Sequence, residues 1–165
     1  MIGAVAGWRR SLAAGVLATG MLVGGCEMAD GITAPAPGDL GAIQRPASPN
    51  TALAGPAGFM PMPNLPTRRY NVPPDRLFAA VRTVIAARPR TVLLGDDMGR
   101  RRTDHVERSL VFRFPDIVLA QVLATDDGQS DLIIYSYSLK GHYDFGVNRR
   151  RVAAILSALD TALMP

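Results

Sequence analysis

The sequence predicts an α+β domain of two layers, in which two helices lie on one face of a sheet of about four antiparallel strands. Two observations lead to this class. Both ends of the stretch 67–165 carry apolar side chains at helical spacing, whereas the segments between them alternate with a period of two. One small domain with the order helix, four strands, helix is therefore expected there.

The first helix is expected over residues 75–88. Its apolar positions fall on one stripe, formed by Leu77, Phe78, Val81, Val84 and Ile85. Arg88 precedes Pro89, and the helix should end there because a proline disfavours helical backbone in the residue before it. A short strand at 91–94 and a turn at 95–99 follow.

Three further strands are expected over 107–114, 117–125 and 131–140. The first gathers three large apolar residues on one face, namely Leu110, Phe112 and Phe114. The second is apolar on both faces, as a central strand is. The run Asp-Asp-Gly-Gln-Ser at 126–130 is expected to join the second and third strands as a hairpin.

The last helix is expected over 148–163. Its apolar stripe consists of Val152, Ile155, Leu156, Leu159 and Leu163. Asn148 is predicted to be the N-cap, because its side-chain oxygen can accept a hydrogen bond from a first-turn N–H group. Each helix is apolar on one stripe only, so both are expected to pack on the same face of the sheet.

The first 25 residues are expected to be a bacterial lipoprotein signal peptide. Arg9-Arg10 form the charged start, an uncharged apolar run covers 12–23, and Val23-Gly24-Gly25-Cys26 is typical of a lipobox. Cys26 is the only cysteine and would carry the lipid; a buried cysteine behind an ordinary signal peptide is the alternative. The expected location is the cell envelope, anchored by lipid and facing the periplasm, and Glu27 favours the outer membrane.

Residues 26–66 are expected to be a disordered tether that begins at the lipidated cysteine. Between 27 and 66 there are eight Pro and five Gly, without hydrophobic periodicity. Such a segment buries too little apolar surface to offset the conformational entropy lost on folding. The predicted organisation is a signal peptide at 1–25, a tether at 26–66 and the α+β domain at 67–165.

The composition argues against several kinds of function. When Arg9 and Arg10 are removed with the leader, 16 basic and 14 acidic side chains remain, so the mature chain is nearly neutral. It also lacks the aromatic and basic pattern of a nucleic-acid-binding module. The two histidines, His105 and His142, stand in no recognised metal-ligand spacing with nearby acids. Neither nucleic acid nor a metal or other cofactor is expected.

The unusual polar residues concentrate in a signature, Ser136-x-Ser-x-x-Gly141-x-x-Asp144-x-Gly146-Val-Asn148-x-x-Arg151. This run closely resembles the terminal signature of the family catalogued as domain of unknown function 1499, and Phe114-Pro115-Asp116 resembles another recurring piece of it. The likeness covers roughly 70–163. The family usually has an arginine after the second serine, where this chain has Leu139. The resemblance implies no activity, since the family has none agreed; many members are small envelope proteins of bacteria or organelle proteins.

The signature favours a structural clamp between the last strand and the last helix. Asp144 and Asn148 can accept from N–H groups at the helix start, Gly146 can adopt positive φ, and Arg151 can pair with Asp144 or Asp116. A helix start with arginines beside it is also a ready anion site, which is the alternative. The predicted clamp or ligand site comprises Ser136, Ser138, Gly141, Asp144, Gly146, Asn148, Arg151 and Asp116.

Two functions follow as hypotheses. The favoured one is a non-catalytic module whose open sheet face receives an anionic envelope ligand or a partner protein, near Ser109, Arg113, Gln121, Ser136 and Ser138. Two basic runs, 100–102 and 149–151, suit anionic partners. The alternative is a hydrolase in which Ser136 or Ser138 is the nucleophile, with His142 as base and Asp144 orienting it. That reading requires a serine hydroxyl within about 3 Å of the imidazole.

Overall fold

The computed structural model describes residues 31–33, 35, 38–46 and 48–164, so the predicted signal peptide and Cys26 lie outside the described residues. The elements in chain order are η1 (Leu40–Ala42), β1 (Thr51–Gly55), β2 (Leu65–Pro66), α1 (Pro74–Ala86), β3 (Thr91–Asp97), β4 (Arg102–Arg108), β5 (Pro115–Ala124), β6 (Ser130–Ser138) and α2 (Val147–Ala162). Two helices and one sheet confirm the α+β class. The sheet has six strands in place of the four predicted.

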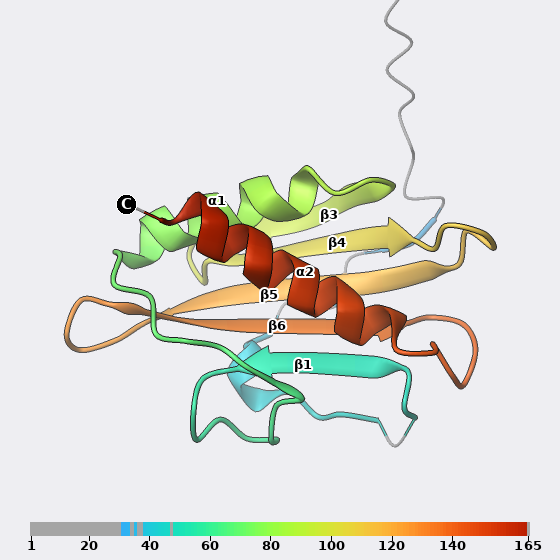
Figure 1. The fold of residues 1–165 in the computed structure, drawn as a ribbon, viewed down its shortest axis with the longest axis horizontal. Helices are drawn as coiled ribbons and strands as arrows, with labels where there is room; N and C mark the ends of the chain where they lie inside the picture. The colour runs from blue at the N-terminus through green and yellow to red at the C-terminus, as the bar shows by residue number, and fades with distance from the viewer. Residues whose placement is uncertain (1–30, 34, 36–37, 47, 165) are drawn as a thin grey trace, which may run out of the picture.

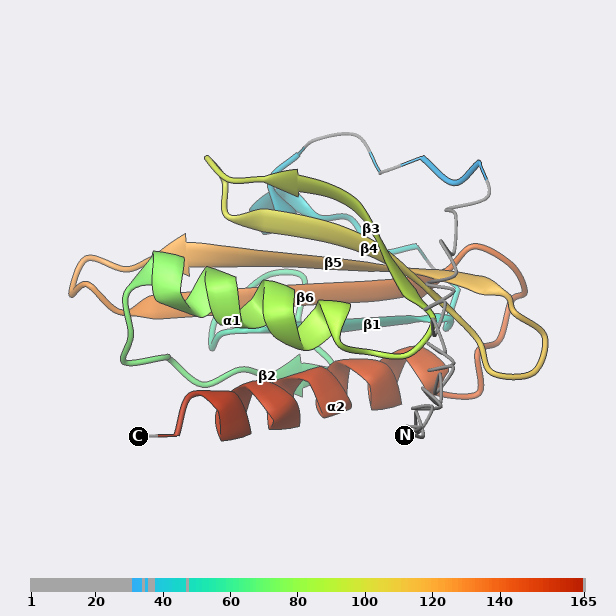
Figure 2. The ribbon, with the colours of Figure 1, turned by 90° about the horizontal axis from the view of Figure 1, so that it is seen from above.

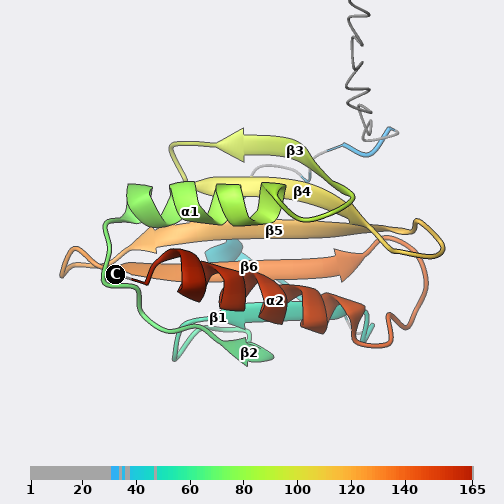
Figure 3. The same ribbon diagram turned by 45° about the horizontal axis from the view of Figure 1, so that its top comes forward.

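The sheet has the order β2-β1-β6-β5-β4-β3, as Figure 3 shows for its central strands. Strands β3 to β6 form an antiparallel meander, and β1 pairs antiparallel with the free side of β6. Only the short β2 runs parallel to its neighbour β1. Strands β5 and β6 share the longest register, from Asp116 opposite Ser138 to Ala124 opposite Ser130.

Both helices pack on one face of the sheet, and this arrangement is visible in Figure 1 and, from above, in Figure 2. In β5 the even-numbered residues face the helices, since side chains alternate between the two faces of a strand. They meet the predicted stripes of both helices in one apolar cluster. Its largest fully buried helical members are Leu77, Val81, Ile85, Ile155 and Leu159. Burial of these stripes holds the two layers together.

The opposite face of the sheet is covered by the segment that precedes α1. Leu40, Ile43 and Phe59 pack there against the odd-numbered residues of β5 and β6. Strand β1 is completely buried between β2 and β6. The prediction of a disordered tether is therefore wrong for the described residues from 38 to 66. The sheet offers an unpaired edge and an apolar face, which a segment of low overall hydrophobicity can use.

The predicted strand at 107–114 is displaced in the structure. Strand β4 covers Arg102–Arg108, and residues 109–114 form the connection to β5. The alternating apolar residues that predicted a strand at 107–114 lie mainly in this exposed loop. Strand β4 itself is mostly polar and almost entirely buried. Strand β3 also runs further than predicted, through a register shift between Leu93 and Gly95. Buried charges inside β4 hid it from a search for apolar periodicity.

Within the described residues, no helix is both long enough and apolar enough to cross a membrane.

Candidate functional site

The predicted signature residues meet at one end of the sheet, around the guanidinium of Arg151. This side chain is only 3% exposed. Its Nη2 donates to Asp116 Oδ2 at 2.6 Å, and its Nη1 donates to Ser136 Oγ at 3.0 Å and to Asn148 Oδ1. Its Nε lies 3.0 Å from Glu107 Oε1, an ion pair whose N–H is not aimed well enough for a hydrogen bond. Of the two predicted partners, Asp116 is the one that Arg151 contacts.

Asp144 closes the start of α2. Its carboxylate accepts from the backbone N–H of Gly146 at 2.9 Å and of Asn148 at 2.8 Å. Gly146 is the N-cap, and its φ of 75° is the positive value predicted for it. The prediction of Asn148 as N-cap is wrong, because Asn148 is the second residue of the helix. Its side chain is turned inward, towards the serines of β6.

Asn148 connects β6, the residue that precedes β1, and the loop before its own helix. Its Nδ2 donates to Ser138 Oγ, to Asn50 O and to Asp144 Oδ2, each at 2.9 Å. Its Oδ1 lies 2.7 Å from Ser136 Oγ. The residue is completely buried, so every one of these bonds replaces a bond to water. Asn148 therefore fixes the helix start to β1 and β6 at once.

Sequence reasoning missed two members of the cluster, Asn50 and Glu107. Asn50 Nδ2 donates to Gly141 O at 2.6 Å, and Asn50 O accepts from Ser138 N at 3.1 Å. Asn50 lies in the segment that was expected to be disordered, so composition concealed it. Glu107 was placed at the start of a strand that is in fact displaced. The chemistry of Arg151 could have indicated further partners. A buried arginine has five N–H donors, which is more than one aspartate can satisfy.

The buried charges of the cluster balance. Glu107 also receives Arg88, whose Nε and Nη2 donate to its two carboxylate oxygens at 2.6 and 3.1 Å. Two arginines thus face Glu107 and Asp116, and the sum of the charges is zero. Burial raises the pKa of Glu107, but the hydrogen bond from Arg88 and the charges of Arg151 and Arg88 outweigh it, so the pKa is lowered overall. The acid stays ionised in the fold.

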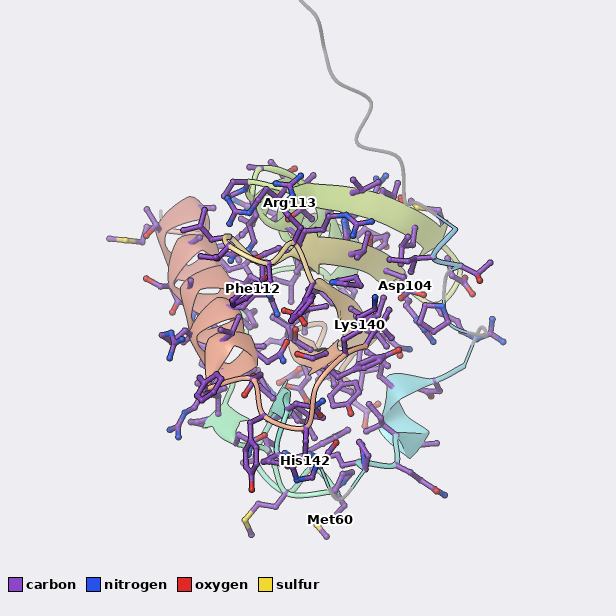
Figure 4. The ribbon with its side chains drawn as sticks, turned by 90° about the vertical axis from the view of Figure 1, so that its right-hand side faces the viewer. Met60, Asp104, Phe112, Arg113, Lys140 and His142 are labelled. Atoms are coloured by element: carbon purple, nitrogen blue, oxygen red, sulfur yellow. The ribbon has the colours of Figure 1, made fainter. Side chains whose placement is uncertain are left out.

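The geometry that the hydrolase alternative needs is not formed. Ser136 Oγ is completely buried, 3.0 Å from Ile117 O, and already engaged by Asn148 and Arg151. His142 is exposed in the loop before α2 (Figure 4). Its ring packs edge-on against that of Tyr143. In the described part of the chain no hydrogen bond joins His142 to either serine. A nucleophile and its base are therefore absent from this constellation.

The open sheet face expected to receive a ligand is also not present. Ser136 lies opposite Val118 and faces α2, whereas Gln121 faces the other side of the sheet. There Gln121 Oε1 accepts from Leu40 N at 2.8 Å. Ser109 and Arg113 belong to the β4–β5 loop. The expected ligand residues are divided among two covered faces and a loop.

The two predicted basic runs differ in the structure. Each arginine of the first run has a carboxylate partner: Arg100 with Asp97, Arg101 with Asp75, and Arg102 with Asp104. In the second run Arg151 is buried, while Arg149 and Arg150 are exposed on the first turn of α2. Arg149 also lines a shallow cavity of about 280 Å³ beside the helix start. The described residues contain no group of three metal-ligating side chains.

The family described as protein of unknown function (DUF1499) matches residues 43–159 of the chain. The chain belongs to the DUF1499 family. The matched range includes the whole signature of this DUF1499 member and also β1 and β2, which the structure places in the sheet. No curated protein matches the chain. Among solved structures, a structural-genomics protein from Nitrosospira multiformis is similar with a TM-score of 0.46 and 8% identity, over 59% of this chain and 92% of that one.

Proposed function

We propose that this DUF1499 protein is a lipid-anchored module of the bacterial envelope that faces the periplasm and acts by binding and not by catalysis. The observation that supports the proposal is the state of the signature. Its polar groups are buried or half-buried and bonded to one another, which supports a role in holding the shape of one end of the domain.

The anion-site reading of the signature loses support for a specific reason. An anion at the start of a helix binds through the first N–H groups. In this chain the carboxylate of Asp144 already accepts from Gly146 N and Asn148 N. An internal acid therefore occupies the position that an external anion would take. The signature is better explained as a clamp that ties β1, β4, β5 and β6 to α2.

The envelope location is proposed from the sequence alone. It depends on the charged start, the apolar run and the lipobox that ends in Cys26. In a bacterial host fed a labelled fatty acid, the complete chain should incorporate the label and fractionate with membranes, favouring the outer membrane. Cys26→Ser should abolish incorporation. Incorporation that survives this substitution would contradict the lipidation site.

The non-catalytic part is tested with a fluorophosphonate probe, which modifies activated serines. We expect Ser136 and Ser138 to remain unmodified in the native protein, because Ser136 is inaccessible and no histidine of the described chain hydrogen-bonds either hydroxyl. The control variant is His142→Ala, which removes an exposed side chain and should leave the unfolding free energy within about 0.5 kcal/mol of wild type. Labelling at either serine that disappears in His142→Ala would establish the hydrolase and overturn the proposal.

A further inference from the structure

The clamp supports two neighbouring loops whose side chains, apart from that of Asp144, take no part in the buried cluster. They are residues 109–114 between β4 and β5 and residues 139–146 between β6 and α2; together they are called the loop end. The loops adjoin neighbouring strands, and Leu139 N in the second loop donates to Pro115 O, directly after the first loop, at 3.1 Å. Figure 4 views this end, with Phe112 and Arg113 on one loop and Lys140 and His142 on the other.

The loop end concentrates the exposed apolar surface of the protein. Of the twelve large hydrophobic side chains that are exposed in the described residues, seven lie in these two loops: Leu110, Val111, Phe112, Phe114, Leu139, Tyr143 and Phe145. Phe112 is 73% and Phe145 88% exposed. Scattered apolar residues on a surface need no explanation, but a cluster of this kind marks a site of interaction.

The β4–β5 loop is held in its projecting shape. Ser109 N donates to Phe114 O, and Phe114 N donates to Ser109 Oγ, both at 2.9 Å. These bonds close the base of the loop, and residues 110–113 project beyond it. The rings of Phe112 and Phe114 stack with their centroids 5.5 Å apart. The apolar side chains of this loop are thus presented together beyond its closed base.

The same end of the molecule carries an excess of basic residues. Residues 87–90, 107–116 and 139–151, which all lie there, contain eight arginines or lysines and three acids. Two of these acids, Glu107 and Asp116, belong to the buried cluster with Arg88 and Arg151, and the third, Asp144, accepts from backbone N–H groups. In the described part of the chain neither Lys140 nor Arg149 forms an ion pair with a carboxylate. Exposed cations therefore surround the apolar side chains.

The opposite end of the molecule shows that this is not a general property of the surface. Its loops contain five arginines and six aspartates, over residues 67–76, 97–101, 125–131 and 160–164. Most of those arginines are paired, for example Arg68 with Asp160 and Arg69 with Asp131. The protein is therefore polarised along the strands, with the positive excess and the apolar side chains at the same end.

We infer that the loop end is a membrane-contact surface that takes the interface of a bilayer containing anionic lipids. Apolar side chains that project beside lysine and arginine match such an interface, which accepts the former at the boundary of the acyl chains and the latter among the headgroups. A second copy of this chain is a poor occupant, because it would bring the same positive excess face to face. The inference deepens the proposed function by naming what the binding module binds, and it rests on the proposed envelope location.

The test uses the chain from residue 26 onward with Cys26→Ser, so that no lipid anchor contributes. All six strands, both helices and both apolar clusters lie within 31–164, so this chain keeps the whole described fold. It also contains no tryptophan, since the only one is Trp8. Phe112→Trp then places a single reporter at the loop end, and Met98→Trp places the matched reporter at an exposed position of the opposite end.

Both reporters are titrated with vesicles of phosphatidylcholine and phosphatidylglycerol in a seven-to-three ratio, and with vesicles of phosphatidylcholine alone. We expect the emission of Phe112→Trp to shift to the blue only with the anionic vesicles, while Met98→Trp does not change. The shift should persist in added inorganic phosphate at constant ionic strength. A response lost to free phosphate would mean a small-anion site and would overturn the inference, as would the absence of any shift.

Two substitutions without a reporter then separate the charge from the apolar contribution in co-sedimentation. Arg149→Ala should weaken vesicle binding about fivefold, while Arg76→Ala, which removes an exposed arginine from the first turn of α1, should not. Phe112→Ser should weaken it about tenfold. If the protein does not bind vesicles but self-associates, and Phe112→Ser abolishes that self-association, the loop end is instead an interface between copies of the chain. If the folded protein does not bind vesicles, only the membrane-contact inference is contradicted. The non-catalytic proposal is tested separately, by the serine probe.

Discussion

Two carboxylates of β4 are buried beside arginines on opposite faces of the sheet, yet their pKa values move in opposite directions. Burial raises the pKa of Glu107, but two arginines outweigh that effect and lower it. Burial also raises the pKa of Asp104; there the single Arg102 does not compensate, and Asp96 and Asp97 add to the increase. The comparison indicates that one arginine neighbour does not by itself lower the pKa of a buried acid: Glu107 contacts two arginines, whereas Asp104 contacts one.

The two clusters also differ in what they connect. Arg102 and Asp104 are two residues apart on one strand, and among the described residues their pair forms a hydrogen bond beyond that strand only from Arg102 to Gly38 O. The Arg151 cluster joins residues of β4, β5, β6 and α2. Breaking the first pair leaves the fold connected. Breaking the second removes the polar links between the start of α2 and the sheet.

The largest expected effect is that of Arg151→Met. Removal of the guanidinium leaves Asp116 without its cation in a buried site and Glu107 with one arginine instead of two. We expect the free energy of unfolding to fall by about 3–5 kcal/mol, measured by urea denaturation of the chain from residue 26. Arg149→Met, on the exposed side of the same turn, is the control. A loss below about 1 kcal/mol for Arg151→Met would break the comparison.

The next effect concerns His105, which lies between the two acids on the same strand. Burial lowers its pKa to about 4, and its Nδ1 has no hydrogen-bond partner among the described residues. The unfolded chain binds a proton near pH 6.5 and the folded chain does not, so stability should fall as the pH drops from about 6.5 towards about 4. The loss should reach about 3 kcal/mol.

His105→Gln provides the check, because glutamine does not titrate and can still bond Thr103, which lies 2.8 Å from His105 Nε2. Urea midpoints measured between pH 7 and pH 4 should be much flatter for this variant than for wild type. Asp96 and Arg82 also act on His105, with opposite signs, and both remain in the variant. An equal slope in the two proteins would assign the acid sensitivity to carboxylates instead.

The sequence was a good guide wherever apolar periodicity decided the structure. Both helices were predicted to within a few residues, because their stripes are long and regular. Strand β1 was missed because a strand inside a sheet takes its stability from neighbours, which the composition of its own segment does not reveal. Strand β4 was displaced because its buried residues are charged, and their burial depends on partners far away in the sequence.

The site was predictable only where its residues are close together in the sequence. The signature lies within one strand, one loop and one helix start, so its residues had to be close whatever the rest of the fold. Asn50 and Glu107 come from elsewhere and are brought in by the pairing of β1 with β6 and of β4 with β5. Such long-range neighbours follow from the sheet order, which a single sequence does not specify.

The smallest expected change in stability concerns the Arg102–Asp104 pair, and it tests most directly whether the two clusters differ. In the double variant Arg102→Met with Asp104→Leu, both members of the local pair are replaced by apolar side chains of similar size. Because burial of Asp104 is not compensated by Arg102, we expect the free energy of unfolding to change by less than about 1 kcal/mol, and an increase is allowed. The single variant Asp104→Leu should be less stable than the double, since it leaves the buried Arg102 charge without its partner. A double variant that loses as much as Arg151→Met would show that the local pair also holds Gly38 and the segment around it on the sheet, and that both clusters are required by the fold.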